Sequence, residues 1–311
     1  LGGDSLRGGS RSLGLLGLLA LLWGSSYMWI SLALDTIPPL TLITFRVGLA
    51  SLILVAILSF RGLRLPSEAH TWRALFIQSI VNSTGPWLLL AWGQQFVDSA
   101  VASVLNSTSP LFVFFFSLFL MSGSDRPAGQ QLLGALAGIA GIVLIVGTGA
   151  LESLGGAFVP QIAVLAGAAL YGIAAIRGRQ FAHLPPLVTA AGTLICSTLT
   201  LLPLSLMFDH PWTLQISPQS LWAAGILSVF CTAFAFLIYF RLINTIGPMG
   251  TSSQAYLRSG IGVLLGIVFL NETLDLETFA GICLAIFGVV LINWRRSKKQ
   301  ASSKTAQESS G

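Results

Sequence analysis

The chain has 311 residues, of which 54% are hydrophobic and only 9% charged, and its mean hydropathy is +0.83. Ordinary soluble domains carry about 25% charged residues, so this composition excludes a soluble globular protein and indicates an all-α integral membrane protein. The net charge of +5 does not indicate a nucleic-acid partner, because the basic residues are dispersed between apolar runs rather than gathered on one face.

A helix that crosses the hydrocarbon core of a bilayer needs about 20 mainly apolar residues. A Gly- and Ser-rich tail, residues 1–11, comes first and is expected to be a remnant of cloning. A basic, disordered tail is expected at 295–311. Ten predicted spans lie between the tails: 12–34, 38–60, 71–93, 98–121, 127–149, 158–178, 184–208, 218–243, 248–270 and 276–294.

The distribution of basic residues predicts the orientation, because Lys and Arg are retained on the cytoplasmic side. With a cytoplasmic N-terminus, the cytoplasmic segments, which are the inner loops and tails with the span ends next to them, hold fourteen of the sixteen Lys and Arg residues, and the outer loops hold none. The other two, Arg46 and Arg258, lie further inside spans. Both termini are therefore predicted to be cytoplasmic.

An internal repeat emerges when the chain is shifted by 147 residues. Gly134 then falls on Gly281, Gly141 on Gly288, and Asp125 on Glu272. The halves, 12–150 and 151–294, would each hold five spans. Because five is odd, the second half would enter the membrane upside down, which predicts two inverted-topology repeats around a central site. A chance match between apolar segments is the alternative.

Polar residues inside the spans are candidates for that site. In the fourth span Ser103, Asn106, Ser107 and Pro110 share one helical face, and in the ninth Thr251, Gln254 and Arg258 do the same. They could line a cavity or join helices by hydrogen bonds. The third span is interrupted near Asn82 and Pro86, and proline frees the carbonyl four residues earlier, which belongs to Asn82 for Pro86 and to Asn106 for Pro110.

Arg258 is the strongest single signal, since a charged residue near the midplane is by default a functional hypothesis. No Asp or Glu lies deep in any predicted span. A substrate carboxylate could therefore serve as its counter-ion, although helix carbonyls, Gln254 or water could do so instead. The missing acid also favours a facilitator or exchanger over direct proton coupling.

The aromatic residues inside the spans complete the predicted site. The predicted substrate-binding residues are Trp23, Ser26, Tyr27, Asn82, Trp87, Trp92, Asn106, Ser107, Pro110, Tyr171, Tyr239, Gln254 and Arg258. No H-E-x-x-H motif, Asp-rich repeat or buried carboxylate pair is found, so we predict no catalytic residue, metal or cofactor and do not favour a membrane enzyme. A passive channel or a sensor is a third possibility that the inverted repeat disfavours.

Several short motifs in this order resemble the EamA-type members of the drug/metabolite transporter superfamily. They are Trp-Gly-Ser-Ser-Tyr at 23–27, Arg46, Pro110, Asn-Glu-Thr-Leu at 271–274, and the glycine patterns of the fifth and tenth spans. The chain departs from symmetry at Leu257, which is the counterpart of Pro110.

The resemblance implies a ten-span carrier of the bacterial inner membrane, most similar to exporters of aromatic amino acids. It implies a substrate that is an aromatic or other apolar amino acid or related metabolite, moved by alternating access. The runner-up is a drug or nucleotide-sugar carrier of the same superfamily. The expected partners are this small molecule and the lipid bilayer, with the protein as a monomer or weak homodimer. In this resemblance Arg46, placed nearer the outer surface, is a structural or gating residue.

Overall fold

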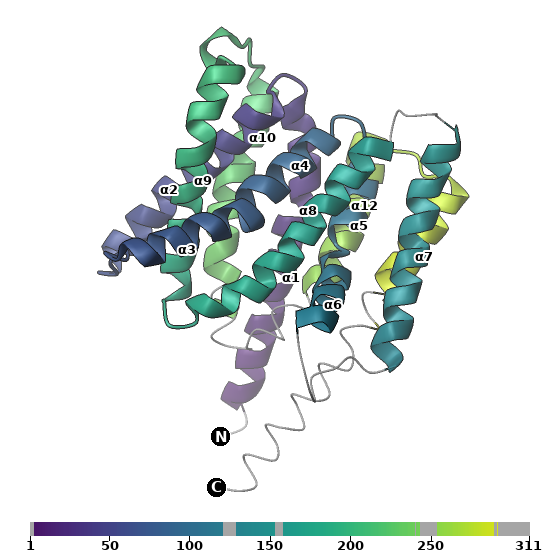
Figure 1. The fold of residues 1–311 in the computed structure, drawn as a ribbon, viewed down its shortest axis with the longest axis horizontal. Coiled ribbons are helices and arrows are strands. Elements are labelled where there is room, and N and C mark those ends of the chain that lie inside the picture. Colours follow the sequence, from purple (N-terminus) through teal and green to yellow (C-terminus); the bar gives the residue numbers. More distant parts are fainter. Residues whose placement is uncertain are drawn as a thin grey trace, which may run out of the picture.

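The computed structural model of the protein describes residues 3–120, 129–152, 158–239, 241–242, 254–288 and 291, and all regular elements in these ranges are helices (Figure 1). Within them, the side chains of 3–12, 117–120, 129–131, 145–152, 179, 255 and 256 are not described. Within the described ranges, seven helices are long and apolar enough to cross a membrane: Leu13–Leu34, Pro39–Phe60, Ala69–Gly93, Ser99–Phe116, Phe158–Arg177, Pro186–Phe208 and Pro218–Tyr239.

Seven of the predicted spans match these helices within a few residues at most ends. The remaining three predicted spans coincide with shorter apolar helices, Leu132–Leu144, Leu257–Leu270 and Leu276–Gly288. The tail predicted at 295–311, Asp125 and Thr251 lie outside the described residues, whereas the predicted junction between the halves, 150/151, falls inside the described range 129–152.

The first half of the chain runs through α1 to α7. Its helices are α1 (Gly3–Leu34), α2 (Pro39–Phe60), α3 (Ala69–Ser79), α4 (Gly85–Gly93), α5 (Ser99–Asn106), α6 (Ser109–Leu120) and α7 (Gly129–Glu152), with the π-helix η1 (Ile80–Thr84) joining α3 to α4. Helix α1 therefore begins inside the stretch predicted as a tail.

The second half starts with α8 (Phe158–Arg177) and repeats much of this pattern. It continues with η2 (Gly178–Phe181), α9 (Pro186–Phe208), η3 (Pro211–Thr213), α10 (Pro218–Ser228), the π-helix η4 (Val229–Phe234), α12 (Gln254–Leu270) and the helix Leu276–Gly288. Both α2 and α9 start at a Pro-Pro pair, Pro38-Pro39 and Pro185-Pro186, whose fixed φ suits the first helical turn.

The two equivalent helices α2 and α9 pack against each other in opposite directions (Figure 1). Thr41, near the start of α2, meets Ser205 near the end of α9, with 2.9 Å between the hydroxyl oxygens. Further along α2, Thr44 donates to the carbonyl of Leu201 at 3.3 Å. The pair is thus antiparallel and joins the first half of the chain to the second.

Helix α7 and its equivalent, Leu276–Gly288, also cross in opposite directions, with glycines at the crossing. A Cβ added to Gly141 would lie 2.7 Å from the carbonyl oxygen of Gly281 and 2.5 Å from the nitrogen of Ala285. One added to Gly288 would lie 2.5 Å from the carbonyl oxygen of Gly134 and 2.4 Å from the nitrogen of Gly138. The two sets of contacts are equivalent under the 147-residue shift, and both need glycine because the helices approach so closely.

Each half also contains one π-helix, at related places in the third and eighth predicted spans. Pro86 follows η1 in the first turn of α4 and has no N–H to donate to the carbonyl of Asn82. At the end of η1, the N–H of Gly85 donates to the carbonyl of Ile80, five residues earlier, which is the π-helical pattern. The break predicted from Pro86 is therefore confirmed, in the form of a π-helix. The second, η4, contains no proline, and the sequence analysis does not predict it.

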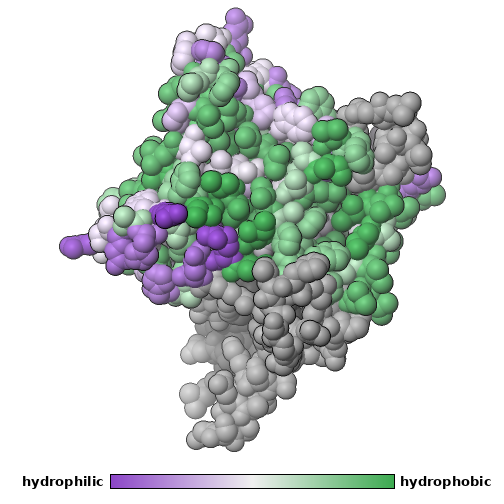
Figure 2. Space-filling model, viewed as in Figure 1, coloured by the Kyte–Doolittle hydropathy of each residue, from purple (hydrophilic) through white to green (hydrophobic). Residues whose placement is uncertain are grey.

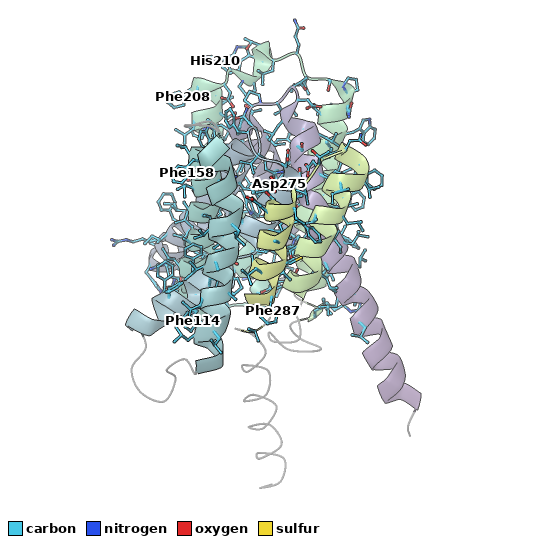
Figure 3. The ribbon with its side chains drawn as sticks, turned by 90° about the vertical axis from the view of Figure 1, so that its right-hand side faces the viewer. Phe114, Phe158, Phe208, His210, Asp275 and Phe287 are labelled. Atoms are coloured by element: carbon cyan, nitrogen blue, oxygen red, sulfur yellow. The ribbon has the colours of Figure 1, made fainter. Side chains whose placement is uncertain are left out.

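The surface suits a membrane environment. Figure 2 shows hydrophobic residues over most of this face, with hydrophilic residues gathered near the α2–α3 connection and at the top of the molecule. Exposed phenylalanines lie toward both ends of the helices in Figure 3, with Phe208 69% exposed near one end and Phe287 54% exposed near the other. Apolar side chains on the outside of long helices are what lipid contact requires.

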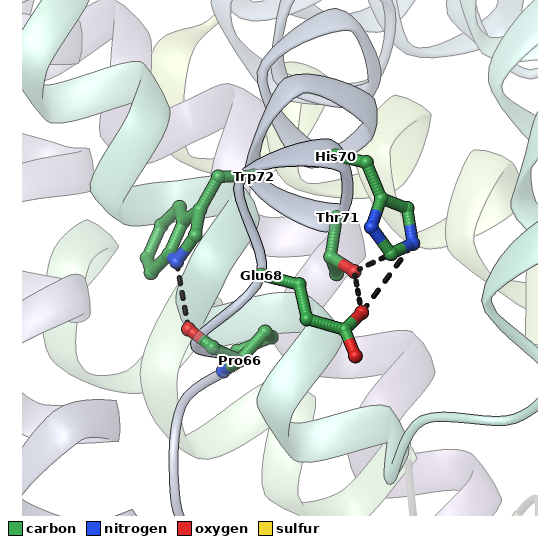
Figure 4. Close-up of polar contacts among 5 residues, drawn as sticks. All are labelled: Pro66, Glu68, His70, Thr71 and Trp72. Atoms are coloured by element: carbon green, nitrogen blue, oxygen red, sulfur yellow. Dashed lines mark hydrogen bonds and ion pairs between the residues drawn. The ribbon is translucent and has the colours of Figure 1, made fainter.

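At the start of α3, local side-chain contacts hold the hydrophilic connection in place (Figure 4). The indole N–H of Trp72 donates to the carbonyl of Pro66 at 2.8 Å, and the hydroxyl of Thr71 donates to Glu68 at 3.2 Å. His70 lies 3.4 Å from the same carboxylate. Both side chains are exposed, so this contact contributes little to stability, whereas the indole of Trp72 ties the first turn of α3 to the preceding connection.

Candidate functional site

The candidate site forms where α1, α5 and α12 meet. Gly24 of α1 lies so close to α12 that an added Cβ would be 2.9 Å from the carbonyl oxygen of Arg258. A Cβ on Gly262 of α12 would lie 2.6 Å from Cβ of Ser103 in α5 and 3.3 Å from the ring of Tyr27. These two glycines bring the polar faces of the three helices together.

Tyr27 is the point of contact between α1 and α5. Its hydroxyl accepts a hydrogen bond from Asn106 Nδ2 at 2.8 Å, and its main-chain carbonyl accepts one from Gln94 at 3.0 Å. The fourth span breaks directly after Asn106, since α5 ends there and α6 begins at Ser109. This is the break expected from Pro110, which lies in the first turn of α6.

Arg258 joins this group from α12. Its Nη2 lies 3.5 Å from the hydroxyl of Ser107, and its buried Nε has no hydrogen-bond partner among the described residues. Within the same part of the chain, two buried acceptors on these faces, Asn106 Oδ1 and Gln254 Oε1, also have no partner. Unpaired buried polar atoms cost about 1–3 kcal/mol each, so this combination of a free donor and two free acceptors needs a complementary group.

A second cation, Arg46 of α2, lies on the adjoining side of the cluster. It is only 4% exposed, and its Nε donates to the hydroxyl of Thr232 in η4 at 2.9 Å. The guanidinium carbon lies 3.9 Å from the ring centroid of Trp87, and the indole N–H of Trp87 donates to the hydroxyl of Tyr171. The position of Arg46 is therefore fixed by contacts with α4 and η4.

These contacts do not neutralise Arg46. A cation–π contact stabilises by about 0.5–2 kcal/mol, whereas an arginine at the centre of a membrane helix costs at least about 2.5–3.5 kcal/mol on insertion scales. Among the described residues, no carboxylate lies within 4 Å of Arg46 or Arg258. Tyr27, Trp87 and Tyr171 pack in one hydrophobic core, which joins the surroundings of the two arginines.

The central cluster thus contains Arg46, Trp87, Tyr171, Thr232, Tyr27, Asn106, Ser107, Gln254 and Arg258. Of these, the sequence predicts Tyr27, Trp87, Asn106, Ser107, Tyr171, Gln254 and Arg258. From the sequence, Arg46 is expected nearer the outer surface in a structural or gating role. In the structure its guanidinium packs against Trp87. Thr232 is missed altogether, because a single threonine in an apolar run carries no signal of a π-helix or of a partner for arginine.

The other predicted residues lie apart from these contacts. Trp23 packs on Tyr239, with 5.4 Å between ring centroids, and accepts the hydroxyl of Ser26 at its carbonyl at 2.6 Å. Asn82 is half-buried in η1. Trp92 is 38% exposed and packs on Phe96 at the end of α4, so the structure does not bring it to the cluster.

Long apolar helices, apolar outer surfaces and a polar cluster in the interior define a multi-pass membrane protein. The chain belongs to the EamA-like transporter family, whose model matches residues 11–147 and again 160–294. It is therefore a membrane transporter with two copies of the family's domain.

Three relatives illustrate the breadth of the match. The "Uncharacterized transporter YoaV" of Bacillus subtilis (strain 168) is 25% identical, with 92% of this chain and 98% of that protein covered. The "Uncharacterized inner membrane transporter YedA" of Escherichia coli (strain K12) is 26% identical, with 90% and 89% covered. The "WAT1-related protein At3g02690, chloroplastic" of Arabidopsis thaliana is 25% identical, with 88% and 67% covered.

One solved structure, described as "Crystal structure of protein", has the same fold. It superimposes with a TM-score of 0.64 at 18% sequence identity, and the alignment covers 91% of this chain and 97% of the other. The helix arrangement is therefore one that a solved protein of similar length also adopts.

Proposed function

We propose that the protein is a carrier of the bacterial inner membrane with ten spans, two inverted five-helix repeats and cytoplasmic termini. The antiparallel packing of equivalent helices supports the inversion. A rotation that exchanges two antiparallel helices must have its axis perpendicular to them, so in a membrane the axis lies in the bilayer plane. The printed name of the Escherichia coli relative, an inner membrane transporter, supports the location.

The charge at the two ends of the helices supports the orientation. Arg61, Arg64 and Arg73 are exposed around the α2–α3 connection, at the end where basic residues are expected. At the opposite end of α2, Asp209 accepts hydrogen bonds from the main-chain N–H and the hydroxyl of Thr41, at 2.8 and 2.7 Å.

For the substrate, we propose an α-amino acid bound between α5 and α12. The observation that carries this proposal is the unpaired Nε of Arg258 beside the unpaired oxygens of Asn106 and Gln254. Arg258 and Ser107 would hold the carboxylate, and the two amide oxygens would accept hydrogen bonds from the ammonium group. The nearby rings of Tyr27, Trp87 and Tyr171 would contact an aromatic or apolar side chain.

Transport would proceed by alternating access, with the carrier acting as a facilitator or exchanger that exports its solute. The interrupted helices supply places where the two halves could bend, because η1, η4 and the break between α5 and α6 already lack regular α-helical hydrogen bonds. The predicted spans contain no deep Asp or Glu that could carry a coupled proton.

The experiment is counterflow in proteoliposomes that are preloaded with unlabelled phenylalanine and given labelled phenylalanine outside. The wild type should accumulate label transiently, and Arg258→Gln should lose at least about 90% of this signal, since a charge-assisted hydrogen bond contributes about 1.5–3 kcal/mol. Arg73→Gln, which removes an exposed arginine of α3, is the matched control. Label accumulation that survives in Arg258→Gln would contradict the proposed site, and no accumulation of any amino acid would contradict the substrate class.

A further inference from the structure

The guanidinium of Arg46 is held in one orientation but keeps hydrogen-bond donors available for a ligand. Its single hydrogen bond uses Nε, and neither Nη atom has a hydrogen-bond partner among the described residues. The ring of Trp87 covers one face of the guanidinium at 3.9 Å, and the bond to Thr232 prevents rotation. The edge that remains is the one that forms paired hydrogen bonds with carboxylate or phosphate oxygens.

The amino acid proposed above accounts for only one of the two arginines. Its carboxylate would be taken by Arg258 and its ammonium by Asn106 and Gln254, which leaves Arg46 without an anion. The described residues offer it none, and no Asp or Glu lies deep in the predicted spans. A desolvated guanidinium without a counter-ion is unfavourable, and the aromatic contact offsets this only in part.

The position of Arg46 indicates which part of a solute it would meet. Arg46 comes from α2 and contacts α4 and η4, whereas Arg258 comes from α12 and contacts α5. Trp87 of α4, beside Arg46, hydrogen-bonds Tyr171 of α8. Helix α8 packs against both α4 and α5, and α5 is the helix that Arg258 contacts. A solute anchored at Arg258 by its α-carboxylate would therefore extend its side chain past these rings toward Arg46.

We propose that Arg46 forms a second anion-binding subsite and that the carrier prefers solutes with a second acidic group, a carboxylate or a phosphate, at the end away from the α-carboxylate. The inference rests on the proposed function for the anchoring of the amino acid head group. It modifies the expectation of a purely apolar side chain, since an apolar group would leave Arg46 uncompensated. Cationic solutes would be excluded by repulsion from both arginines.

The test compares pairs of competitors that have nearly the same size and differ in charge. Glutamate against glutamine and aspartate against asparagine test a carboxylate, and O-phosphoserine against serine tests a phosphate. Each is added in increasing concentration to proteoliposomes performing counterflow of labelled phenylalanine. In the wild type, the acidic member of at least one pair should inhibit at about a tenfold lower concentration than its neutral partner, and the identity of that pair distinguishes carboxylate from phosphate.

Arg46→Gln should abolish this difference by raising the inhibitory concentration of each acidic solute about tenfold relative to that of its neutral partner. Arg61→Gln, an exposed position at the end of the same helix, should retain the full difference. Equal inhibition within every pair in the wild type would overturn the proposal without any variant, so the test does not depend on the folding of Arg46→Gln.

Glutarate separates this inference from the proposed function, because it has two carboxylates and no ammonium group. If labelled glutarate shows counterflow that requires Arg46 while amino acids neither compete nor accumulate, the amino-acid substrate is wrong and the second anion subsite stands. If neutral amino acids are carried but each acidic solute inhibits at the same concentration as its neutral partner, the proposed function stands and the subsite is wrong.

Discussion

The carboxylate of Glu272 accepts a hydrogen bond from the main-chain N–H of Ser99 at 2.7 Å, across the boundary between the two halves of the chain. Its second oxygen accepts the N–H of Ala100 at 2.9 Å. The first N–H groups of a helix have no partner within the helix, so Glu272 caps α5 from the end of α12 and its negative charge also suits the positive end of the helix dipole. The contact ties together the two helices that carry Asn106, Ser107 and Arg258.

We therefore expect Glu272→Ala to destabilise the protein by about 1–3 kcal/mol, because two main-chain donors lose a charged acceptor. The melting temperature in detergent should fall, and counterflow should weaken with it. Glu277→Ala removes an exposed carboxylate five residues later and should leave both unchanged. Equal melting temperatures for Glu272→Ala and the wild type would show that the cap does not support the fold.

The equivalent glycine contacts between α7 and the helix Leu276–Gly288 give a second prediction. Gly141→Ala places a methyl group 2.5 Å from the nitrogen of Ala285, where only main-chain atoms could move aside. Overpacking of this kind costs about 1–3 kcal/mol, so the variant should melt at a lower temperature. Gly225→Ala is the control, since nothing lies within 4 Å of its added Cβ, and it should be neutral or more stable because alanine favours a helix. Gly141→Ala with wild-type stability would contradict the close crossing.

Much of the fold follows from the sequence for clear physical reasons. Long apolar runs must become helices in a membrane, because lipid offers no partner for main-chain polar groups. Helices α2 and α9 begin at Pro39 and Pro186, within two residues of the predicted starts at 38 and 184. The glycines that match across the halves, such as Gly141 and Gly288, are the residues at the tight crossing. Proline breaks were also predictable, because Pro86 and Pro110 remove specific donors.

The central cluster was only partly predictable. A face of one helix can be read from spacing, which identified Asn106, Ser107, Gln254 and Arg258, but which helices meet is a tertiary property. Arg46 could have been recognised as a buried charge without an acidic partner. Its contact with Thr232 could not, since η4 arises without a proline and brings together residues 186 positions apart in the chain.

That contact gives the third prediction, in which Thr232 acts as a positioning residue. Thr232→Val keeps the shape of the side chain and removes the acceptor for Arg46 Nε, so the guanidinium loses its fixed orientation. In the competition assay, the advantage of the acidic solutes should fall about three- to tenfold, in line with about 0.5–1.5 kcal/mol for one hydrogen bond, while neutral solutes inhibit as before. Thr200→Val removes a hydroxyl that bonds only to the carbonyl of Cys196 in its own helix and should change nothing. A uniform loss of all competition would indicate a structural role instead.

Asp275 and Asp98 each lie directly before a membrane helix, Leu276–Gly288 and Ser99–Phe116, and should give the stability opposite dependences on pH. At the start of the helix Leu276–Gly288, hydrogen bonds from Thr278 lower the pKa of Asp275. Its stabilising contribution is therefore full above the ordinary carboxyl pKa of about 3.9 and is lost as the pH falls through the lowered value. For Asp98, which is only partly removed from solvent, desolvation raises the pKa, so its ionised form opposes folding at neutral pH and this cost disappears as the pH falls through the raised value.

Melting temperatures of Asp275→Ala and Asp98→Asn, measured from pH 7 down to pH 3, test both signs in one series. Asp275→Ala should melt below the wild type at pH 7 and approach it at the acidic end, because the wild-type carboxylate becomes protonated there. Asp98→Asn should melt above the wild type at pH 7, and this advantage should also shrink with acidification. The two variants differ in sign at pH 7 because desolvation raises the pKa of a carboxyl group, whereas hydrogen bonds donated to the carboxylate lower it. A common sign for the two variants at pH 7 would mean that the surroundings of one acid differ from those described.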